Sequence, residues 1–143
     1  MNKSSFQLQG YPRETAIAEK FQAMVALGIV NDRMKDCYDI WILSAQANIS
    51  GQTLVEALRA TFQARKTALP NELPAAFSDE FIREKQGDWK RFVSRFAGVE
   101  ETPSLEQVII QLRKFLLPPV EAALKGADFD FLWEAGKSWV KNR

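Results

Sequence analysis

The sequence has 143 residues, with no histidine and only one cysteine. Without histidine, the chain cannot carry Ser-His-Asp or Cys-His catalysis, an imidazole general base, or a zinc site that includes histidine. A single cysteine cannot form a disulfide within the chain, and nearby carboxylates disfavour the thiolate of Cys37, so we expect a small core residue there. Chemistry by this chain would therefore use carboxylates, lysines and arginines.

The chain also has little net charge and no long hydrophobic run. Its 19 Lys and Arg residues nearly balance 18 Asp and Glu residues, and a formal charge of +1 does not by itself indicate a nucleic-acid or membrane partner. The apolar run from Met24 to Val30 is far shorter than the roughly 20 residues of a membrane span. The first five residues also lack the apolar core of a signal peptide. We therefore expect a cytoplasmic protein with no membrane partner.

Apolar spacing and capping residues predict an all-α fold, a helical bundle of about five to six helices. The expected helices run from Pro12 to Leu27, from Asn31 or Asp32 to about Gln46, from Gln52 to Arg65, from Ser78 to Phe96, and onward from the start signal Thr102-Pro103-Ser104. Pro118 and Pro119 are expected to kink or end the last of these helices before a short continuation to Lys125.

The two ends of the chain differ in composition. The C-terminal tail has too many large aromatic residues for a solvated extension, so we expect it to fold back onto the helices; these are Phe129, Phe131, Trp133 and Trp139. Residues 1–10 are predicted to be an N-terminal stub, with either a short edge strand through Phe6 and Leu8 or disorder. Residues 11–143 are predicted to form a single helical domain, because no repeat or long linker divides them.

Lys20 does not suit an ordinary amphipathic helix. At about 100° per residue, its neighbours on the helix surface are apolar, which places the ammonium in the middle of the apolar face; they are Ala16, Ile17, Ala23, Met24 and Leu27. A buried ammonium costs on the order of several kcal/mol unless it is paired. We therefore expect Lys20 to bind a carboxylate or an anionic ligand. The alternative is a lysine that extends along the helix to solvent or pairs internally.

Charged residues also gather in the segment from Arg33 to Asp39. Asp32, Asp36 and Asp39 have the spacing i, i+4 and i+7, and Lys35 precedes Asp39 by four residues. Consecutive helices joined by a short loop usually pack antiparallel, which would bring Lys20 toward Asp36 or Asp39. The alternative is a solvated helix start whose salt bridges contribute about 0.3–0.5 kcal/mol each.

These segments together resemble the AbiEii/AbiGii family of nucleotidyltransferase toxins. The resemblance covers nearly everything after Gly10 and is to the helical C-terminal half of the family. Its most specific part is the Lys-Asp-x-x-Asp motif at residues 35–39. The stretches that carry it are Tyr11-Pro12-Arg13-Glu14-Thr15, Ala18-Glu19-Lys20-Phe21, Ala23-Met24, Arg33-Met34-Lys35-Asp36-Cys37-Tyr38-Asp39-Ile40, Arg59-Ala60-Thr61-Phe62, Phe115-Leu116-Leu117-Pro118 and Trp133 to Trp139.

In that family the other half is a nucleotidyltransferase lobe, whose Gly-Ser turn and Asp-x-Asp pair hold the triphosphate and its metal ions. This chain contains no Gly-Ser dipeptide, and its one Asp-x-Asp, from Asp128 to Asp130, lies among aromatic residues and is expected to be structural. We therefore expect no metal site in this chain. The resemblance implies that a nucleoside triphosphate with Mg²⁺ binds where a complementary lobe is present.

The resemblance also implies roles for particular residues. Lys20 matches a lone motif lysine, and Lys35, Asp36 and Asp39 match the Lys-Asp-x-x-Asp motif; these four would be the catalytic residues that face the nucleotide. Lys20 and Lys35 would bind its phosphates, and Glu14 and Arg33 would support them. Because nucleotidyl transfer needs metal ions, we expect the isolated chain to bind a nucleotide or a partner rather than to catalyse.

Two classes of function remain at this point. The first is the C-terminal lobe of a bacterial nucleotidyltransferase toxin, from a toxin–antitoxin or phage abortive-infection system. Its partners would be a complementary lobe or an antitoxin-like protein. The alternative is a non-enzymatic helical interaction module or homodimer, including a truncated gene remnant. The nucleotide and the acceptor, nucleic acid or other, are left open.

Overall fold

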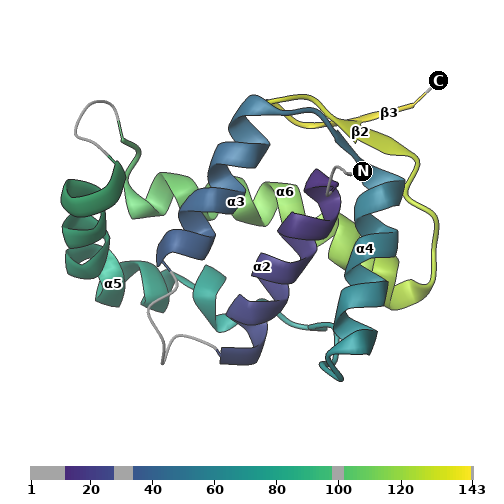
Figure 1. Ribbon diagram of the computed structural model, residues 1–143, viewed down its shortest axis with the longest axis horizontal. Coiled ribbons are helices and arrows are strands. Elements are labelled where there is room, and N and C mark those ends of the chain that lie inside the picture. The colour runs from purple at the N-terminus through teal and green to yellow at the C-terminus, as the bar shows by residue number, and fades with distance from the viewer. Residues whose placement is uncertain (1–11, 28–33, 98–101, 143) are drawn as a thin grey trace, which may run out of the picture.

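The computed structural model describes residues 12–27, 34–97 and 102–142 (Figure 1). Five α-helices account for most of these residues: α2 (Arg13–Leu27), α3 (Met34–Gln46), α4 (Gly51–Ala64), α5 (Asp79–Phe92) and α6 (Leu105–Lys125). The predicted all-α class and the approximate number of helices are therefore confirmed. The N-terminal stub and Arg33 lie outside the described residues. Within the described ranges, none of the helices combines the length and apolarity needed to cross a membrane.

Serine residues begin three of the helices. The side-chain oxygens of Ser50, Ser78 and Ser104 each accept a hydrogen bond from the backbone N–H three residues later. At Ser104 the bond is reciprocal, because the side chain of Gln107 accepts from the backbone N–H of Ser104 at 2.9 Å. Such caps satisfy backbone donors that the first helical turn leaves free. The start signal before Leu105 is thus confirmed.

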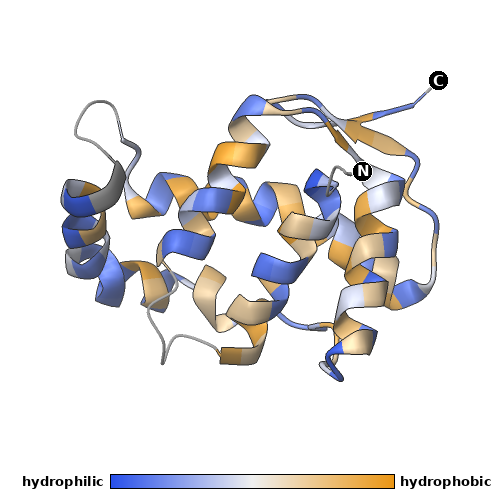
Figure 2. Cartoon of the chain, viewed as in Figure 1, coloured by the Kyte–Doolittle hydropathy of each residue, from blue (hydrophilic) through white to orange (hydrophobic). Residues whose placement is uncertain are grey.

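The core forms around α6. Helices α3, α4 and α5 all pack on α6, and α2 lies across α3 and α4 (Figure 1). Each helix carries both apolar and polar residues (Figure 2), as expected when one face is buried. Cys37 is 0% exposed within this core, which confirms its prediction as a core residue. The helix expected to reach Phe96 changes earlier, because residues Val93–Ala97 form a π-helical turn after α5.

Pro118 and Pro119 lie inside α6 and do not end it, so the helix end that the sequence offered as one of two outcomes is wrong. A proline inside a helix frees the carbonyl four residues earlier, because it has no N–H to donate. For Pro119, the carbonyl four residues earlier is that of Phe115. This carbonyl accepts a hydrogen bond from the indole Nε1 of Trp139 at 3.0 Å. The ring of Trp139 also stacks on the ring of Phe115, with centroids 5.6 Å apart. The indole N–H of Trp139, in the tail, therefore replaces the backbone N–H that Pro119 lacks.

The tail folds back as expected, but as part of a small sheet that the all-α prediction omits. Strand β1 (Ile49–Ser50), between α3 and α4, pairs antiparallel with β2 (Phe131–Trp133), which pairs antiparallel with β3 (Trp139–Lys141). Trp133 is fully buried at its centre and donates from Nε1 to the carbonyl of Ser44 at 2.7 Å. Strands of two or three residues are too short to show a period of two in the sequence.

Gly51 provides a test of this packing, because α4 begins against the tail. A Cβ at position 51 would lie 2.6 Å from a ring carbon of Phe129 and 2.7 Å from the carbonyl oxygen of Phe131. We expect Gly51→Ala to lower the free energy of unfolding by about 1–3 kcal/mol through overpacking. Gly87→Ala is the matched control, since a Cβ there meets only the end of Arg91, at 3.6 Å. In urea denaturation, Gly87→Ala should raise the free energy of unfolding by about 0.5–1 kcal/mol. Equal effects of the two substitutions would contradict the close contact between Gly51 and the tail.

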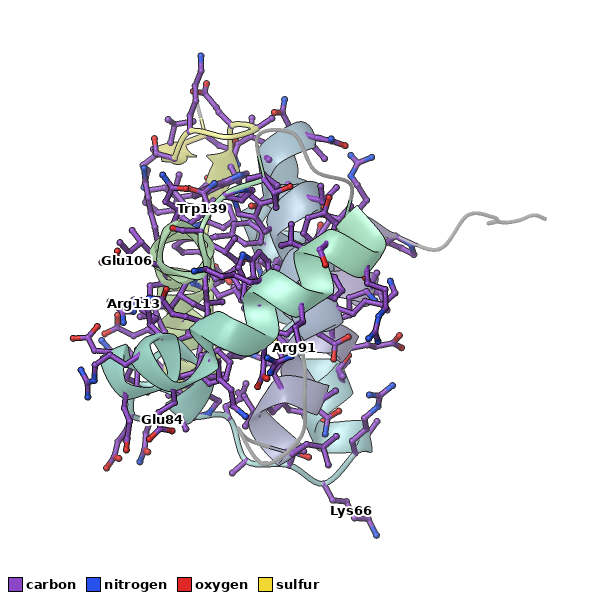
Figure 3. The ribbon with its side chains drawn as sticks, turned by 90° about the vertical axis from the view of Figure 1, so that its left-hand side faces the viewer. Lys66, Glu84, Arg91, Glu106, Arg113 and Trp139 are labelled. Carbon is purple, nitrogen blue, oxygen red and sulfur yellow. The ribbon has the colours of Figure 1, made fainter. Side chains whose placement is uncertain are left out.

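The end of α4 gives a second prediction. Lys66 has a φ of 54°, its N–H donates to the carbonyl of Gln63, and the N–H of Thr67 donates to the carbonyl of Phe62. The same arrangement ends α6, where Gly126 has a φ of 67°. Glycine adopts this left-handed conformation at no steric cost, and Lys66 is solvent-exposed (Figure 3). Lys66→Gly should therefore raise the free energy of unfolding by about 1 kcal/mol in urea denaturation. Gly126→Ala should lower the free energy of unfolding. A lower free energy of unfolding for Lys66→Gly would contradict this account.

Candidate functional site

Helices α2 and α3 are joined by a cluster of three charged side chains, which we call the Asp39 cluster: Lys20, Lys35 and Asp39. The Nζ of Lys20 donates to Oδ2 of Asp39 at 3.0 Å, across the two helices. The Nζ of Lys35 donates to the same oxygen at 2.8 Å, one turn earlier on α3. One carboxylate oxygen therefore holds two ammonium groups from two helices.

Lys20 has the carboxylate partner that the sequence predicts, but its position on α2 differs. Its side chain is 32% exposed, so it lies at the edge of the buried face of α2 rather than in the middle. The buried residues of α2 include two of the neighbours that the projection counts, Ile17 and Met24, together with Phe21. The helical projection is wrong here because Leu27, one of the apolar neighbours it counts, is 39% exposed and does not belong to the core.

The electrostatics of the cluster favour the charged forms of Asp39 and Lys35. Burial alone would raise the pKa of Asp39, but the hydrogen bonds and charges of Lys35 and Lys20 outweigh burial and lower that pKa below its ordinary value of 3.8. The hydrogen bond and charge of Asp39 likewise raise the pKa of Lys35 above 10.5, and the charge of Asp36 adds to this effect. At neutral pH Asp39 is therefore an anion that pairs with the Lys35 cation, and Lys20 donates to the same oxygen.

The other residues of the predicted site are more dispersed. Asp36 lies on α3 next to the cluster and is half-buried. Glu14 is six residues before Lys20, about 9 Å along the axis of α2. Its Oε2 accepts a hydrogen bond from the backbone N–H of Ser50 at 3.0 Å, so it ties the start of α2 to the start of α4. The structure thus brings together Lys20, Lys35 and Asp39, with Asp36 adjacent.

Sequence analysis missed the aromatic group that holds α3 beside α5. The ring of Tyr38 lies 6.1 Å from that of Trp41, 6.3 Å from that of Trp89 and 5.6 Å from that of Phe92, measured between centroids. Tyr38 directly precedes Asp39, so these contacts help to hold α3 in place beside the Asp39 cluster. The signal that could have found it is the spacing of Tyr38 and Trp41, three residues apart on one helix face.

The carboxylates of the cluster do not fit a divalent metal ion. Asp39 already accepts hydrogen bonds from two ammonium groups through one oxygen, whereas Mg²⁺ needs carboxylate oxygens that are free to bind it. Asp128 and Asp130 are exposed on the tail, where Asp130 accepts from the side chain of Asn142 at 2.9 Å. Over the part of the chain that the structure describes, no group of three or more potential metal ligands occurs.

A comparison with protein-family models finds a family that this chain matches. A family model described as "Nucleotidyl transferase AbiEii toxin, Type IV TA system" matches residues 2–124. The matched range includes the Asp39 cluster and ends before the hairpin of β2 and β3. No curated protein and no solved structure gives a significant match.

The cluster predicts a dependence of stability on pH. Because folding lowers the pKa of Asp39, its stabilisation is complete above 3.8 and is lost as the pH falls through the lower folded-state value. Asp39→Asn should therefore reduce the free energy of unfolding by about 1 kcal/mol at pH 7, and urea denaturation should show the difference shrinking near pH 3.

The control for this experiment is Asp79→Asn, which removes an 80% exposed partner of Arg113. Exposed ion pairs contribute little, so a smaller loss at pH 7 is expected for this variant. A difference between wild type and Asp39→Asn that stayed constant from pH 7 to pH 3 would contradict the lowered pKa of Asp39.

Proposed function

The chain belongs to the AbiEii family of nucleotidyltransferase toxins of type IV toxin–antitoxin systems, and from this premise we propose that its Asp39 cluster binds the phosphates of a nucleoside triphosphate. The observation that carries the proposal is the shared carboxylate. Lys20 and Lys35 both donate to one oxygen of Asp39, so two ammonium groups share one carboxylate oxygen. A phosphate oxygen can take the place of Asp39 at either ammonium.

The two lysines have different roles in this proposal. The side chain of Lys35 is 75% exposed, whereas that of Lys20 is 32% exposed. Lys35 can therefore turn from Asp39 toward a phosphate without rearranging the core, and it is the first phosphate ligand. Lys20 provides the second positive charge from the neighbouring helix and keeps α2 and α3 together. A lysine suits this task because its ammonium is a compact charge with three donors on a flexible stem.

Asp36 and Asp39 would act next to the phosphates rather than on a metal ion. Asp39 aligns both ammonium groups. Once a phosphate draws Lys35 away, the carboxylate of Asp39 can accept a hydrogen bond from a hydroxyl of the ribose or of the acceptor. Glu14 supports the cluster indirectly through its bond to the start of α4, and Arg33, six residues before Asp39, is a further candidate cation.

Catalysis would additionally require Mg²⁺, which supplies charge neutralisation between the attacking and leaving oxygens. Since Asp39 is committed to two ammonium groups, we propose that carboxylates of a complementary nucleotidyltransferase lobe hold the metal ions. The described helices would then form one wall of the nucleotide site. An antitoxin-like protein is the other partner that the family suggests.

Nucleotide binding tests the proposal directly. Isothermal titration calorimetry with each of the four common ribonucleoside triphosphates, without metal, should detect weak binding by the wild-type chain. Lys35→Ala should raise the Kd at least about fivefold, which corresponds to about 1 kcal/mol, and Lys20→Ala should do the same. Lys137→Ala, which removes an exposed lysine from the tail, is the matched control and should leave the Kd unchanged. Equal loss from all three variants, or no binding of any triphosphate, would contradict the proposal.

A further inference from the structure

The outer face of α6 carries an apolar stripe that the described structure leaves partly exposed, although Leu117 in its middle also packs against the edge of the core. The buried residues of α6, such as Leu112, Leu116 and Pro119, lie on the opposite side of the helix. In contrast, Ile110 is 51% exposed and Leu124 is 44% exposed, and Leu117 between them is half-buried. Figure 3 shows the same face in profile, with Glu106 and Arg113 of α6 along the outer edge of the molecule.

The spacing of this stripe is that of a coiled-coil seam. Ile110, Leu117 and Leu124 are seven residues apart, and two exposed charged residues, Lys114 and Glu121, lie between them. The five positions thus alternate in steps of four and three residues, as the a and d positions of a heptad do. At about 100° per residue they fall within about 80° of arc, so they form one continuous line along α6.

A hollow beside the stripe extends its apolar surface. Leu73, from the segment between α4 and α5, is 48% exposed and lines this hollow of about 400 Å³ together with Leu117, Val120 and Leu124. Of the four exposed large hydrophobic residues in the described ranges, three therefore lie on this side: Leu73, Ile110 and Leu124. Contiguous apolar surface of this kind is typical of a protein interface.

The charges in the stripe indicate what covers it. Lys114 lies three residues before Leu117 and Glu121 lies four residues after it. Suppose that two copies of α6 cross antiparallel at Leu117. Measured along the helix axis, Lys114 of one copy then lies within about 1.5 Å of the height of Glu121 of the other. By the same symmetry Ile110 faces Leu124. A parallel arrangement would instead set Lys114 against Lys114 and Glu121 against Glu121, which is unfavourable.

We propose that the outer face of α6 is the interface of a symmetric homodimer, in which two copies of the chain pack antiparallel with the two-fold axis at Leu117. Such an interface is isologous, because the same residues of both copies form it. Glu121 already pairs with Lys125 of its own helix at 2.9 Å, and both side chains are about two-thirds exposed. Lys114 of the second copy joins this pair from the other side. Helices α2 and α3 lie on the opposite side of α6 (Figure 1), so both Asp39 clusters stay open to solvent.

Sedimentation equilibrium over a range of protein concentrations tests the interface. The wild-type chain should show a reversible monomer–dimer equilibrium. Leu117→Glu should raise the dimer Kd at least tenfold, because it sets two carboxylates against each other at the two-fold axis. Leu27→Glu, at an exposed leucine of α2, is the matched control and should leave the Kd unchanged. A circular dichroism spectrum confirms that each variant is folded, and Ile110→Glu provides a second interface variant. A monomer at every concentration up to the millimolar range would overturn the proposal.

A charge exchange distinguishes the antiparallel pair from other dimers. Lys114→Glu should raise the Kd at least fivefold, because the new carboxylate lies beside Glu121 of the second copy. The double variant Lys114→Glu with Glu121→Lys has the net charge of the wild type and should return the Kd to within threefold of it. If the double variant dimerises no better than Lys114→Glu, the antiparallel arrangement is wrong.

Cysteine cross-linking locates the two-fold axis. The native Cys37 is 0% exposed and does not interfere. Under mild oxidation, Leu117→Cys should give a disulfide-linked dimer, because the two copies of residue 117 face each other. Ile110→Cys alone should not cross-link, whereas Ile110→Cys combined with Leu124→Cys should. Cross-linking of Ile110→Cys as readily as Leu117→Cys would indicate a parallel pair and overturn the proposal.

Discussion

The architecture depends on α6 continuing unbroken through Pro118 and Pro119. Helices α3, α4 and α5 all pack on α6, so a break at the prolines would divide their common support. The tail supplies a partner for the carbonyl of Phe115, because the indole of Trp139 donates a hydrogen bond to this carbonyl and stacks on the Phe115 ring. Burying a carbonyl without a partner costs about 1–3 kcal/mol. The hairpin of β2 and β3 is therefore a structural part of the helical bundle, although it lies beyond the family match, which ends at residue 124.

The Asp39 cluster depends on α6 indirectly, through the packing of α3 on α6. Helix α3, which carries Asp39 and Lys35, packs against α6 and, through Tyr38, against α5. Helix α2 then reaches the same carboxylate through Lys20. In the function we propose, a phosphate that replaced Asp39 at one lysine would meet a second lysine already in place. The membership in a nucleotidyltransferase family is consistent with an anionic substrate.

Much of the helical architecture follows from local signals. Serine caps at Ser50, Ser78 and Ser104 and the apolar spacing of α6 suffice to place helices, because these features act within one or two turns. A carboxylate partner for Lys20, either Asp36 or Asp39, was also predictable, since consecutive helices joined by a short loop usually pack antiparallel. The sheet was not, because Ile49 pairs with Trp133, more than eighty residues away, and neither strand exceeds three residues. The continuity of α6 was missed for the same reason, since a distant indole, that of Trp139, binds the carbonyl that the proline frees.

The central claim, that the Asp39 cluster is the phosphate-binding site, is tested most directly by nuclear magnetic resonance. A titration of the labelled chain with a nucleoside triphosphate would follow the lysine Nζ signals and the Asp39 carboxyl carbon. Our account predicts that the signals of Lys20, Lys35 and Asp39 shift together and saturate at one triphosphate concentration, while those of Lys137 and Lys125 stay in place. A shift that leaves Lys35 and Asp39 unmoved, or that affects all lysines alike, would contradict it.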